Sequence, residues 1–217
     1  MSKIVWDNTG ERRYETGVDH GVLYVQNDQG AYPEGVAWNG LISVSENADG
    51  GDPNDLWADN IKYATLRGSE NKNLSIEAYN YPPEFEECDG TKEAAEGVYV
   101  SQQPRKTFGM TYRTAIGTDT SPAGDTKYKL HLVYNASCSP SERSYETMNE
   151  SPDAITFSWD VTTTPVAVTG FKPTALITID STKVDSTKLT ALEDELYGTE
   201  QKAAHLPSPD EVLAKLK

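Results

Sequence analysis

The sequence predicts a mainly β protein: a β-sandwich or partly open barrel with one small helix beside it and a short helical C-terminal extension. Short runs of alternating apolar and polar residues recur along most of the chain, and turns rich in Gly, Pro and Asn separate them. Helical spacing of apolar residues begins only after Thr182. Successive side chains of a strand point to opposite faces, so a period of two indicates strands. A chain of 217 residues can form one such domain with a sizeable core.

The stretch from Asn60 to Gly90 carries the clearest signals, which predict two strands followed by a short helical turn. Two alternating runs, Ile61–Leu66 and Leu74–Tyr79, flank the polar segment GSENKN, which predicts a hairpin with a longer loop. The pair Pro82-Pro83 ends the second strand, because proline cannot donate to a sheet ladder. Pro83 is expected to open a short helical turn that ends near Gly90. This turn carries Glu84, Glu86 and Glu87.

The N-terminal part contains two further strand regions. Residues 1–17 are polar and predict an arm rather than a core element. Strands are expected at Val18–Gln26 and Gly35–Glu46, where Gly40 marks a bulge or a close backbone approach. The segment Asn47–Asp55 has the sequence NADGGDPND and predicts a loop.

The middle of the chain predicts a second hairpin. Thr91–Glu96 is expected to form a polar turn or a helical stub. Val98–Gln102 and Lys106–Thr114 are expected to pair, and residues 115–126 to form a loop. One face of the second strand of this hairpin carries Phe108, Met110 and Tyr112.

A regular alternation follows at Lys127–Tyr134. Its inward positions are expected to be Tyr128, Leu130, Leu132 and Tyr134, and its outward positions Lys127, Lys129 and His131. Further strands are expected at Tyr145–Glu150, at Ala154–Thr163 and at Thr174–Asp180, with Pro165–Thr169 continuing or bending the middle one. One face of Ala154–Thr163 carries Ile155, Phe157, Trp159 and Val161.

Two helices are expected at the C-terminus. The first has Asp185 or Ser186 as its N-cap and Gly198 beyond its end, and its apolar side consists of Val184, Leu189, Leu192 and Leu196. The second begins at Ser208-Pro209 with a capping box to Glu211. Its apolar side consists of Val212, Leu213 and Leu216. The expected domain organisation is therefore an arm (1–17), a β domain (18–181) and a helical extension (182–217).

The composition argues against several classes of protein. A net charge of -15 is unfavourable for gripping nucleic acid, which requires Lys and Arg at the phosphates. No apolar run is long enough for a membrane-spanning helix or a signal peptide, so a cytoplasmic place of synthesis and no membrane contact are expected. Cys88 and Cys138 fit neither a disulfide framework nor a zinc site. Two reduced thiols are expected, with a single bridge as the alternative.

No catalytic, cofactor-binding or metal-binding residue is predicted. Nucleophile-elbow, zinc-protease and phosphate-loop motifs are absent, and His20, His131 and His205 are expected to be exposed on an arm, a strand face and a linker. The segment Asp49–Asp55 offers oxygen ligands for calcium, but turn chemistry alone explains its composition. The tryptophans leave a sugar-binding module open as an alternative, although Trp159 is expected in the core.

Three long segments carry a resemblance to a known family. They are YPEGVAWNGLISVSE through IEAYNYPPEFEECDG, then GVYVSQQPRKTFGMTYRT, then YKLHLVYNASCSPSERSYETMNESPDAITFSWDVTTTPV with FKPTALITIDSTKV. Together, from about Gly17 to Val184, they resemble the major tail proteins (tail tube proteins) of long, non-contractile-tailed bacteriophages. The motifs are structural, so their specificity lies in their order and extent.

The resemblance implies a structural role without catalysis. It implies a tail-tube type of β fold, self-assembly into stacked hexameric rings, and a lumen that conducts DNA into the host without specific binding. The implied partners are the tape measure protein, the tail tip and the tail terminator. The implied locations are the tail of the virion and, during assembly, the bacterial host cytoplasm. A carbohydrate- or receptor-binding β-sandwich is the alternative function.

Roles for particular segments are hypotheses within that family. The Asn60–Ile76 hairpin and the Ile42–Glu46 strand are expected to line the lumen, which is expected to be negative. The loop Asn47–Asp59 and the N-terminal arm are expected to make contacts between rings. Unpaired strand edges, which a second subunit can satisfy, favour self-assembly independently of the resemblance.

Overall fold

The computed structural model describes residues 3–124, 126–145, 147 and 153–217. One large antiparallel sheet dominates it, with the strand order β2-β1-β9-β10-β11-β6-β3 and with β12 paired to β10. The strands are β1 (Arg13–Val25), β2 (Gly35–Trp38), β3 (Leu41–Gly50), β6 (Glu70–Ala78), β9 (Phe108–Thr118), β10 (Tyr128–Cys138), β11 (Phe157–Thr163) and β12 (Leu176–Asp180). The mainly β prediction is confirmed.

The sheet curls so that β3, at one end of the strand order, approaches β1 near the other end, but the two strands form no hydrogen-bonded ladder. Strand β3 contacts β1, and a Cβ atom on Gly21 would lie 2.4 Å from Cδ1 of Leu41. Glycine at position 21 therefore allows the close approach of these strands. Gly40 allows another, because its φ is 81° and its carbonyl accepts a hydrogen bond of 2.8 Å from the amide of Tyr79. The architecture is a partly open barrel.

The inside of the curl holds the first of two cores. Trp38, Phe85 and Trp159 contact one another there, with ring centroids 4.5 to 5.7 Å apart. The short helices η1 (Pro83–Phe85) and α1 (Glu86–Asp89) place Phe85 and Cys88 in this core. The predicted helical turn is confirmed, and Gly90 ends it with a φ of 82°.

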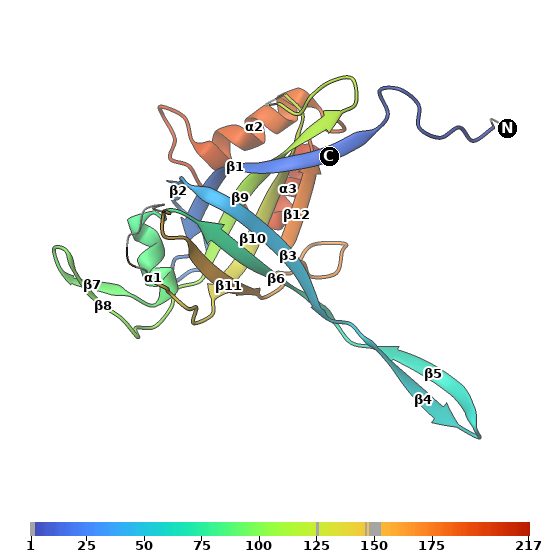
Figure 1. Cartoon of the computed structure of the whole chain (residues 1–217), viewed down its shortest axis with the longest axis horizontal. Coiled ribbons are helices and arrows are strands. Elements are labelled where there is room, and N and C mark those ends of the chain that lie inside the picture. The colour runs from blue at the N-terminus through green and yellow to red at the C-terminus, as the bar shows by residue number, and fades with distance from the viewer. Residues whose placement is uncertain (1–2, 125, 146, 148–152) are drawn as a thin grey trace.

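The second core lies on the outer face of the sheet, beneath the C-terminal helices α2 (Ser186–Tyr197) and α3 (Pro209–Leu216) (Figure 1). Asp185 caps α2, and Ser208 with Glu211 forms the predicted capping box of α3. The expected inward residues of β10 face these helices, so that prediction is confirmed. Leu130, Leu132 and Tyr134 join Leu189, Leu192, Leu196 and Val212.

Three sequence-based predictions about strands are wrong because they considered only local signals. Residues 13–17 of the expected arm belong to β1, and residues 115–118 of an expected loop extend β9. The segment Thr91–Glu96 contains β7 (Lys92–Ala95), which pairs with β8 (Val98–Val100). Strand β8 therefore does not pair with β9 as expected. In each case a partner strand elsewhere in the chain satisfies the backbone.

The strands expected on either side of β11 and within it are confirmed only in part. Ile155 is exposed and precedes β11, while Val166 forms only an isolated bridge with Thr174. The strand expected at Tyr145–Glu150 falls largely outside the described residues. Phe157, Trp159 and Val161 share the apolar face as predicted, and β12 confirms the strand expected before Asp180.

Both cysteines are free thiols in the first core. Burial raises the pKa of the Cys88 thiol to about 12 and raises that of Cys138 as well. Since the thiolate is the reactive form, we expect neither thiol to react with a maleimide at neutral pH in the folded protein. Mass spectrometry should show two additions only after denaturation. Modification of the native protein at the unfolded rate would contradict the burial of these residues.

Candidate assembly surfaces

One outer face of the sheet consists of small polar side chains in register. Strands β3, β6 and β11 place Ser43, Glu77 and Ser158 in one row across the sheet. The same pairings create two further rows. We call these ten residues the polar face: Ser43, Ser45, Asn47, Asn73, Ser75, Glu77, Ser137, Ser158, Asp160 and Thr162.

The alternation along the strands creates this face. On β6, Leu74, Ile76 and Ala78 point into the first core, so the residues between them must point outward. The hydroxyl of Ser43 donates a hydrogen bond of 3.0 Å to Glu77. The ten residues include two carboxylates, Glu77 and Asp160, and no Lys or Arg. The face is therefore negative and offers no cation to a phosphate.

Strand β3 leaves one of its edges unpaired. Among the strands of the described chain it pairs only with β6, and its contact with β1 forms no ladder. Unpaired amide and carbonyl groups along a strand edge can accept a strand from another chain. The polar face therefore ends at an edge that a second subunit can extend.

The hairpin between β3 and β6 is long and projects from the barrel. Strand β4 (Pro53–Ala58) pairs with β5 (Ile61–Arg67), and β3 pairs with β6 as far as Gly50 and Glu70. The turn at its tip is Asp59-Asn60, and both residues have positive φ angles of 52° and 61°. Asp and Asn tolerate this conformation, which two-residue hairpin turns require. We call residues 51–69 the distal ribbon (Figure 1).

The pairing of strands in and next to the distal ribbon shows that two predictions are wrong. Asn47–Asp55 is not a loop, because Asn47–Gly50 pair with β6 and Pro53–Asp55 pair with β5. The runs Ile61–Leu66 and Leu74–Ala78 are strands, but they do not pair with each other. The segment NADGGDPND has strong turn signals, yet backbone pairing over a longer distance satisfies more of its polar groups.

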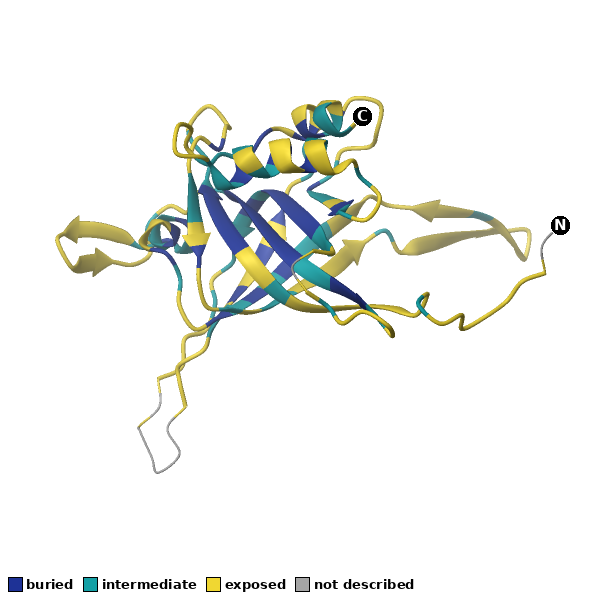
Figure 2. Cartoon of the chain, turned by 90° about the horizontal axis from the view of Figure 1, so that it is seen from above, coloured by how far each residue is buried: buried dark blue, intermediate teal, exposed yellow. Residues whose placement is uncertain are grey.

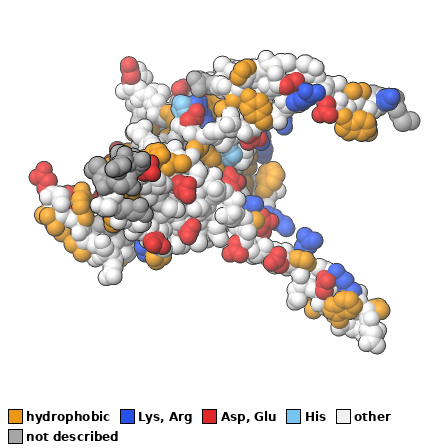
Figure 3. Space-filling model, in the orientation of Figure 1, with side chains coloured by type: hydrophobic (Ala, Val, Ile, Leu, Met, Phe, Trp, Pro, Cys, Tyr) orange, Lys and Arg blue, Asp and Glu red, His pale blue; other side chains and the backbone are white. Residues whose placement is uncertain are grey.

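Large apolar side chains cover the distal ribbon although nothing in the described chain buries them. Trp57 is 69% exposed and Tyr63 is 71% exposed. The same is true of two other projecting parts, the N-terminal segment with Trp6 and the hairpin β7–β8 (Figures 2 and 3). The other exposed apolar residues of these three parts are Ile4, Val5, Leu56, Ile61, Leu66, Val98, Tyr99 and Val100. Exposed apolar surface of this extent is typical of an interaction site.

His131 is buried, and the prediction of an exposed histidine is wrong at this position. Strand β10 is covered on both faces, by the helices on one side and by the inside of the curl on the other. The His131 ring is stacked on Tyr112 with centroids 4.6 Å apart, and its Nδ1 lies 3.4 Å from a Glu46 oxygen. The Tyr112 hydroxyl donates a 2.6 Å hydrogen bond to the same oxygen. Glu46 thereby ties the base of the projecting hairpin to β9 and β10.

This arrangement predicts a pH-dependent contribution of Glu46. The hydrogen bonds from His131 and Tyr112 hold the pKa of the Glu46 carboxyl below its usual value, against the opposing effect of partial burial. A lowered pKa in the folded state stabilises the protein above the usual carboxyl pKa of about 4.3, and this contribution is lost as the pH falls through the folded value. We expect Glu46→Gln to cost about 1 to 2 kcal/mol at pH 7.

Urea denaturation of both proteins at several pH values checks this prediction. The difference between wild type and Glu46→Gln should shrink as the pH falls below about 4. Glu34→Gln, on an exposed loop, is the matched control and should change little. A difference that does not depend on pH would contradict the assigned role of the carboxylate.

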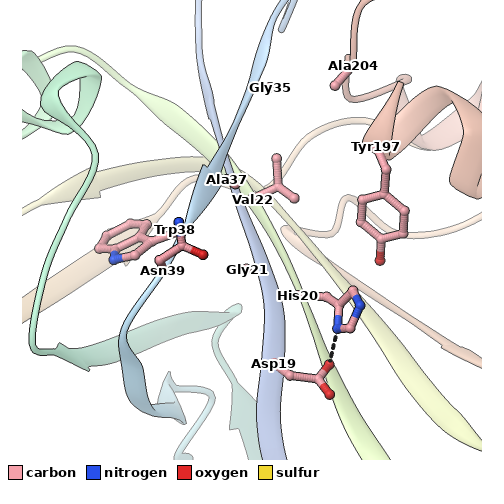
Figure 4. Close-up of a pocket in the computed structure, with 10 residues that line it drawn as sticks. All are labelled: Asp19, His20, Gly21, Val22, Gly35, Ala37, Trp38, Asn39, Tyr197 and Ala204. Atoms are coloured by element: carbon pink, nitrogen blue, oxygen red, sulfur yellow. Dashed lines mark hydrogen bonds and ion pairs between the residues drawn. The ribbon is translucent and has the colours of Figure 1, made fainter. Parts of the chain in front are cut away.

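The other two histidines lie in different parts of the structure. His20 lies in an irregular part of β1, where its φ is 50°, and its Nδ1 is 2.8 Å from Asp19. His205 is half-buried near α3, so the expected exposure is wrong at this position too. Asp19 and His20 border a hollow of about 510 Å³ between β1, β2 and the end of α2 (Figure 4). The buried hydroxyl of Tyr197, in the wall of this hollow, has no hydrogen-bond partner within the described part of the chain.

Two further observations concern metals and membranes. In the described ranges, no three His, Cys, Asp or Glu side chains are grouped so that they could hold a metal ion. None of the described helices has the length and apolar character that crossing a membrane requires.

Trp38 and Trp159 are core residues, so neither provides an exposed platform for a sugar ring.

Comparisons with known proteins give remote structural similarities. No protein-family model matches the sequence, and no curated protein matches it. A chain of the PVC sheath-tube complex in the extended state, from an extracellular contractile injection system, is 12% identical with a TM-score of 0.40. That alignment covers 74% of this chain and 88% of the other.

Two other solved structures are similar at the same level. A chain of the PVC sheath/tube terminator in the extended state has 12% identity and a TM-score of 0.37, with 82% of this chain and 99% of the other covered. A chain of the anti-feeding prophage baseplate has 10% identity and a TM-score of 0.37, with 82% and 97% covered. Scores of this size do not define a function for this chain.

Proposed function

We propose that this protein is the structural subunit of the tail tube of a long, non-contractile-tailed bacteriophage. Copies assemble into hexameric rings, the rings stack, and DNA passes through the lumen into the host. The resemblance of residues 17–184 to the major tail proteins supports this proposal. The polar face, backed by an apolar core and ending at the open edge of β3, is the single observation that carries it.

The polar face is the proposed lining of the lumen. Its residues come from β3, β6, β11 and the end of β10, so the expected lumen-lining role of Ile42–Glu46 is retained for β3. The role expected for Asn60–Ile76 is retained only for the β6 part. A surface with Glu77 and Asp160 and without cations releases no counterions from DNA and repels its phosphates. DNA can therefore move past it without being held.

Ring closure follows from the open edge of β3. A heterologous contact between identical subunits forms a closed ring when the rotation between neighbours closes. In such a ring the β3 edge of one subunit pairs with a strand edge of its neighbour, which satisfies the open backbone groups of β3 in every copy. The distal ribbon and the N-terminal segment remain available for contacts between rings, as expected for Asn47–Asp59 and the arm.

The remaining partners follow from this role. A tape measure protein inside the growing tube, a tail tip at one end and a terminator at the other are the proposed contacts. The proposed location is the tail of the virion, after assembly in the host cytoplasm. No step of this function requires a catalytic residue or a cofactor.

Negative-stain electron microscopy of the concentrated protein at several salt concentrations tests the proposal. Rings or tubes with a central channel are the expected result. Monodisperse monomers under all these conditions, together with a glycan-dependent rise in the melting temperature, would replace it by the carbohydrate-binding alternative. Asp160→Lys and Glu77→Lys add a test of the lining: DNA ejection from assembled tails should slow, because the lumen then attracts phosphates.

A further inference from the structure

Two apolar ribbons project from opposite ends of the molecule. The distal ribbon lies at one end of the longest axis and the hairpin β7–β8 lies at the other, and both views agree on this (Figures 1 and 2). Each is a separate two-stranded sheet that is not part of the large sheet. An isolated two-stranded hairpin is marginally stable in water, so each ribbon gains stability from a partner.

The strands β5 and β8 expose the apolar surface of these ribbons. Ile61, Tyr63 and Leu66 of β5 are 61%, 71% and 55% exposed. Val98, Tyr99 and Val100, which form all of β8, are also exposed. The two strands therefore offer apolar surfaces of the same kind at the two ends of one chain.

Charge distinguishes strand β5 from the hairpin β7–β8. Lys62 of β5 forms an ion pair of 2.8 Å with Asp55 on β4, whereas no carboxylate in the described part of the chain pairs with Arg67. Beside β8 lies a hollow of about 420 Å³, which we call the acidic hollow. Its lining includes Glu84, Glu86, Glu87 and Glu93, together with Tyr99 and Lys106.

The carboxylates of the acidic hollow outnumber its cation. Lys106 forms an ion pair with Glu87, which leaves the other three without a cation among the lining residues. Burial and the charge of Glu93 raise the pKa of the Glu86 carboxyl, and Glu86 and Glu93 together raise the pKa of the Tyr99 hydroxyl. These carboxylates are therefore close enough to repel one another, and a cation from outside would relieve that repulsion.

We propose that β7–β8 and the acidic hollow of one copy bind strand β5 of the next copy along the tube. The inference rests on the proposed function and identifies the surface of the receiving ring. Ile61 and Tyr63 of β5 contact Tyr99, and Arg67 faces the carboxylates of the hollow. Because the two surfaces differ and lie at opposite ends, the contact repeats without closing and extends the assembly along one direction.

Cross-linking between two single variants tests this contact. Tyr63→Cys and Tyr99→Cys proteins are mixed, assembled and treated with a short bis-maleimide; the native Cys88 and Cys138 are buried and do not interfere. The mixture should give a covalent dimer that carries one cysteine of each kind. Tyr63→Cys mixed with Phe171→Cys is the matched control, since Phe171 is exposed on a different part of the surface.

The outcomes separate this inference from the proposed function. Rings or tubes that form without a Tyr63–Tyr99 product, or with as much of the Phe171 product, overturn the inference and leave the proposed function intact. Monodisperse monomers under every condition, together with a glycan-dependent rise in the melting temperature, overturn both. A dimer enriched in assembled material over unassembled material supports both.

Charge exchange provides a second readout. Arg67→Glu, or Glu86→Lys with Glu93→Lys, should each reduce the mass of stacked tubes by about tenfold or more while single rings persist. The three substitutions combined should restore stacking, because opposite charges again face each other. All three residues are outside both cores, so melting temperatures should stay close to that of the wild type. Failure of the combination to restore stacking would count against the assigned pairing.

Discussion

A chain in which an Asn-Gly turn replaces residues 51–69 is expected to fold normally and to form no tubes. Strands β3 and β6 remain paired up to Gly50 and Glu70, where a two-residue turn can join them. None of the removed side chains belongs to either core. Loss of the exposed Trp57 and Tyr63, by contrast, removes apolar surface that the proposed ring-to-ring contact needs.

Electron microscopy and sedimentation measure tube formation, and thermal denaturation measures whether the shortened chain folds. The melting temperature should fall by no more than a few degrees, about 1 kcal/mol for a domain of this size. Phe171→Ser is the control, because it removes an exposed aromatic residue elsewhere and should leave assembly unchanged. Tubes of normal length from the shortened chain would remove the distal ribbon from the assembly.

Deleting Asn47–Asp55, the change that the sequence alone suggests for the same test, would have a different effect. Asn47–Gly50 pair with residues 70–73 of β6, so their loss would unpair part of the large sheet. Asn47 also belongs to the proposed lumen lining. A failure to assemble would then report damage to the subunit as well as loss of the contact. The 51–69 replacement avoids this ambiguity.

A chain that ends at Lys183 is expected to lose cooperative folding. Helices α2 and α3 cover one face of the sheet, and without them the outer face of β1, β10 and β12 would meet water. Each exposed large apolar side chain costs about 1.5 to 3 kcal/mol, so uncovering seven of them costs about 10 to 20 kcal/mol, as much as the usual stability of about 5 to 15 kcal/mol or more. The residues uncovered would be Val22, Tyr24, Tyr32, Leu130, Leu132, Tyr134 and Ile179.

A point substitution tests the same packing in the complete chain. Leu192 of α2 is fully buried against the sheet, so Leu192→Ala should cost about 2 to 5 kcal/mol in urea denaturation. Leu213→Ala, on the half-buried side of α3, is the matched control and should cost less. A single cooperative transition in the shortened chain would show that residues 182–217 are an independent extension, as the predicted domain boundary implies.

Local signals in the sequence predicted many elements correctly. The caps at Asp185 and Ser208, the glycines at positions 90 and 198, and the Pro82-Pro83 pair act on neighbouring backbone groups. Such signals work within a few residues and are therefore visible in the sequence. The alternation along β6 and β11 likewise predicted which side chains enter the first core, and so which form the polar face.

Pairing partners are a different matter, because they depend on segments far apart in the chain. The sequence suggested that β5 pairs with β6 and β8 with β9, since each is next in order, but β5 pairs with β4 and β8 with β7. The sequence shows the apolar residues of both ribbons, but it does not show that they are exposed together on one surface. Their positions at opposite ends of the molecule appear only in three dimensions (Figure 2).

Signals between neighbouring residues specify the mainly β class, the two C-terminal helices and, through the alternation along β6 and β11, the side chains that face away from the first core. Three features appear only in the folded chain: the pairing of the strands, the burial of β10 on both faces, and the contacts of Glu46 with Tyr112 and His131. The difference arises from how far apart in the sequence the interacting residues lie. Caps, turns and alternation are properties of adjacent residues, whereas sheet pairing and double burial depend on which distant surfaces the folded chain brings together.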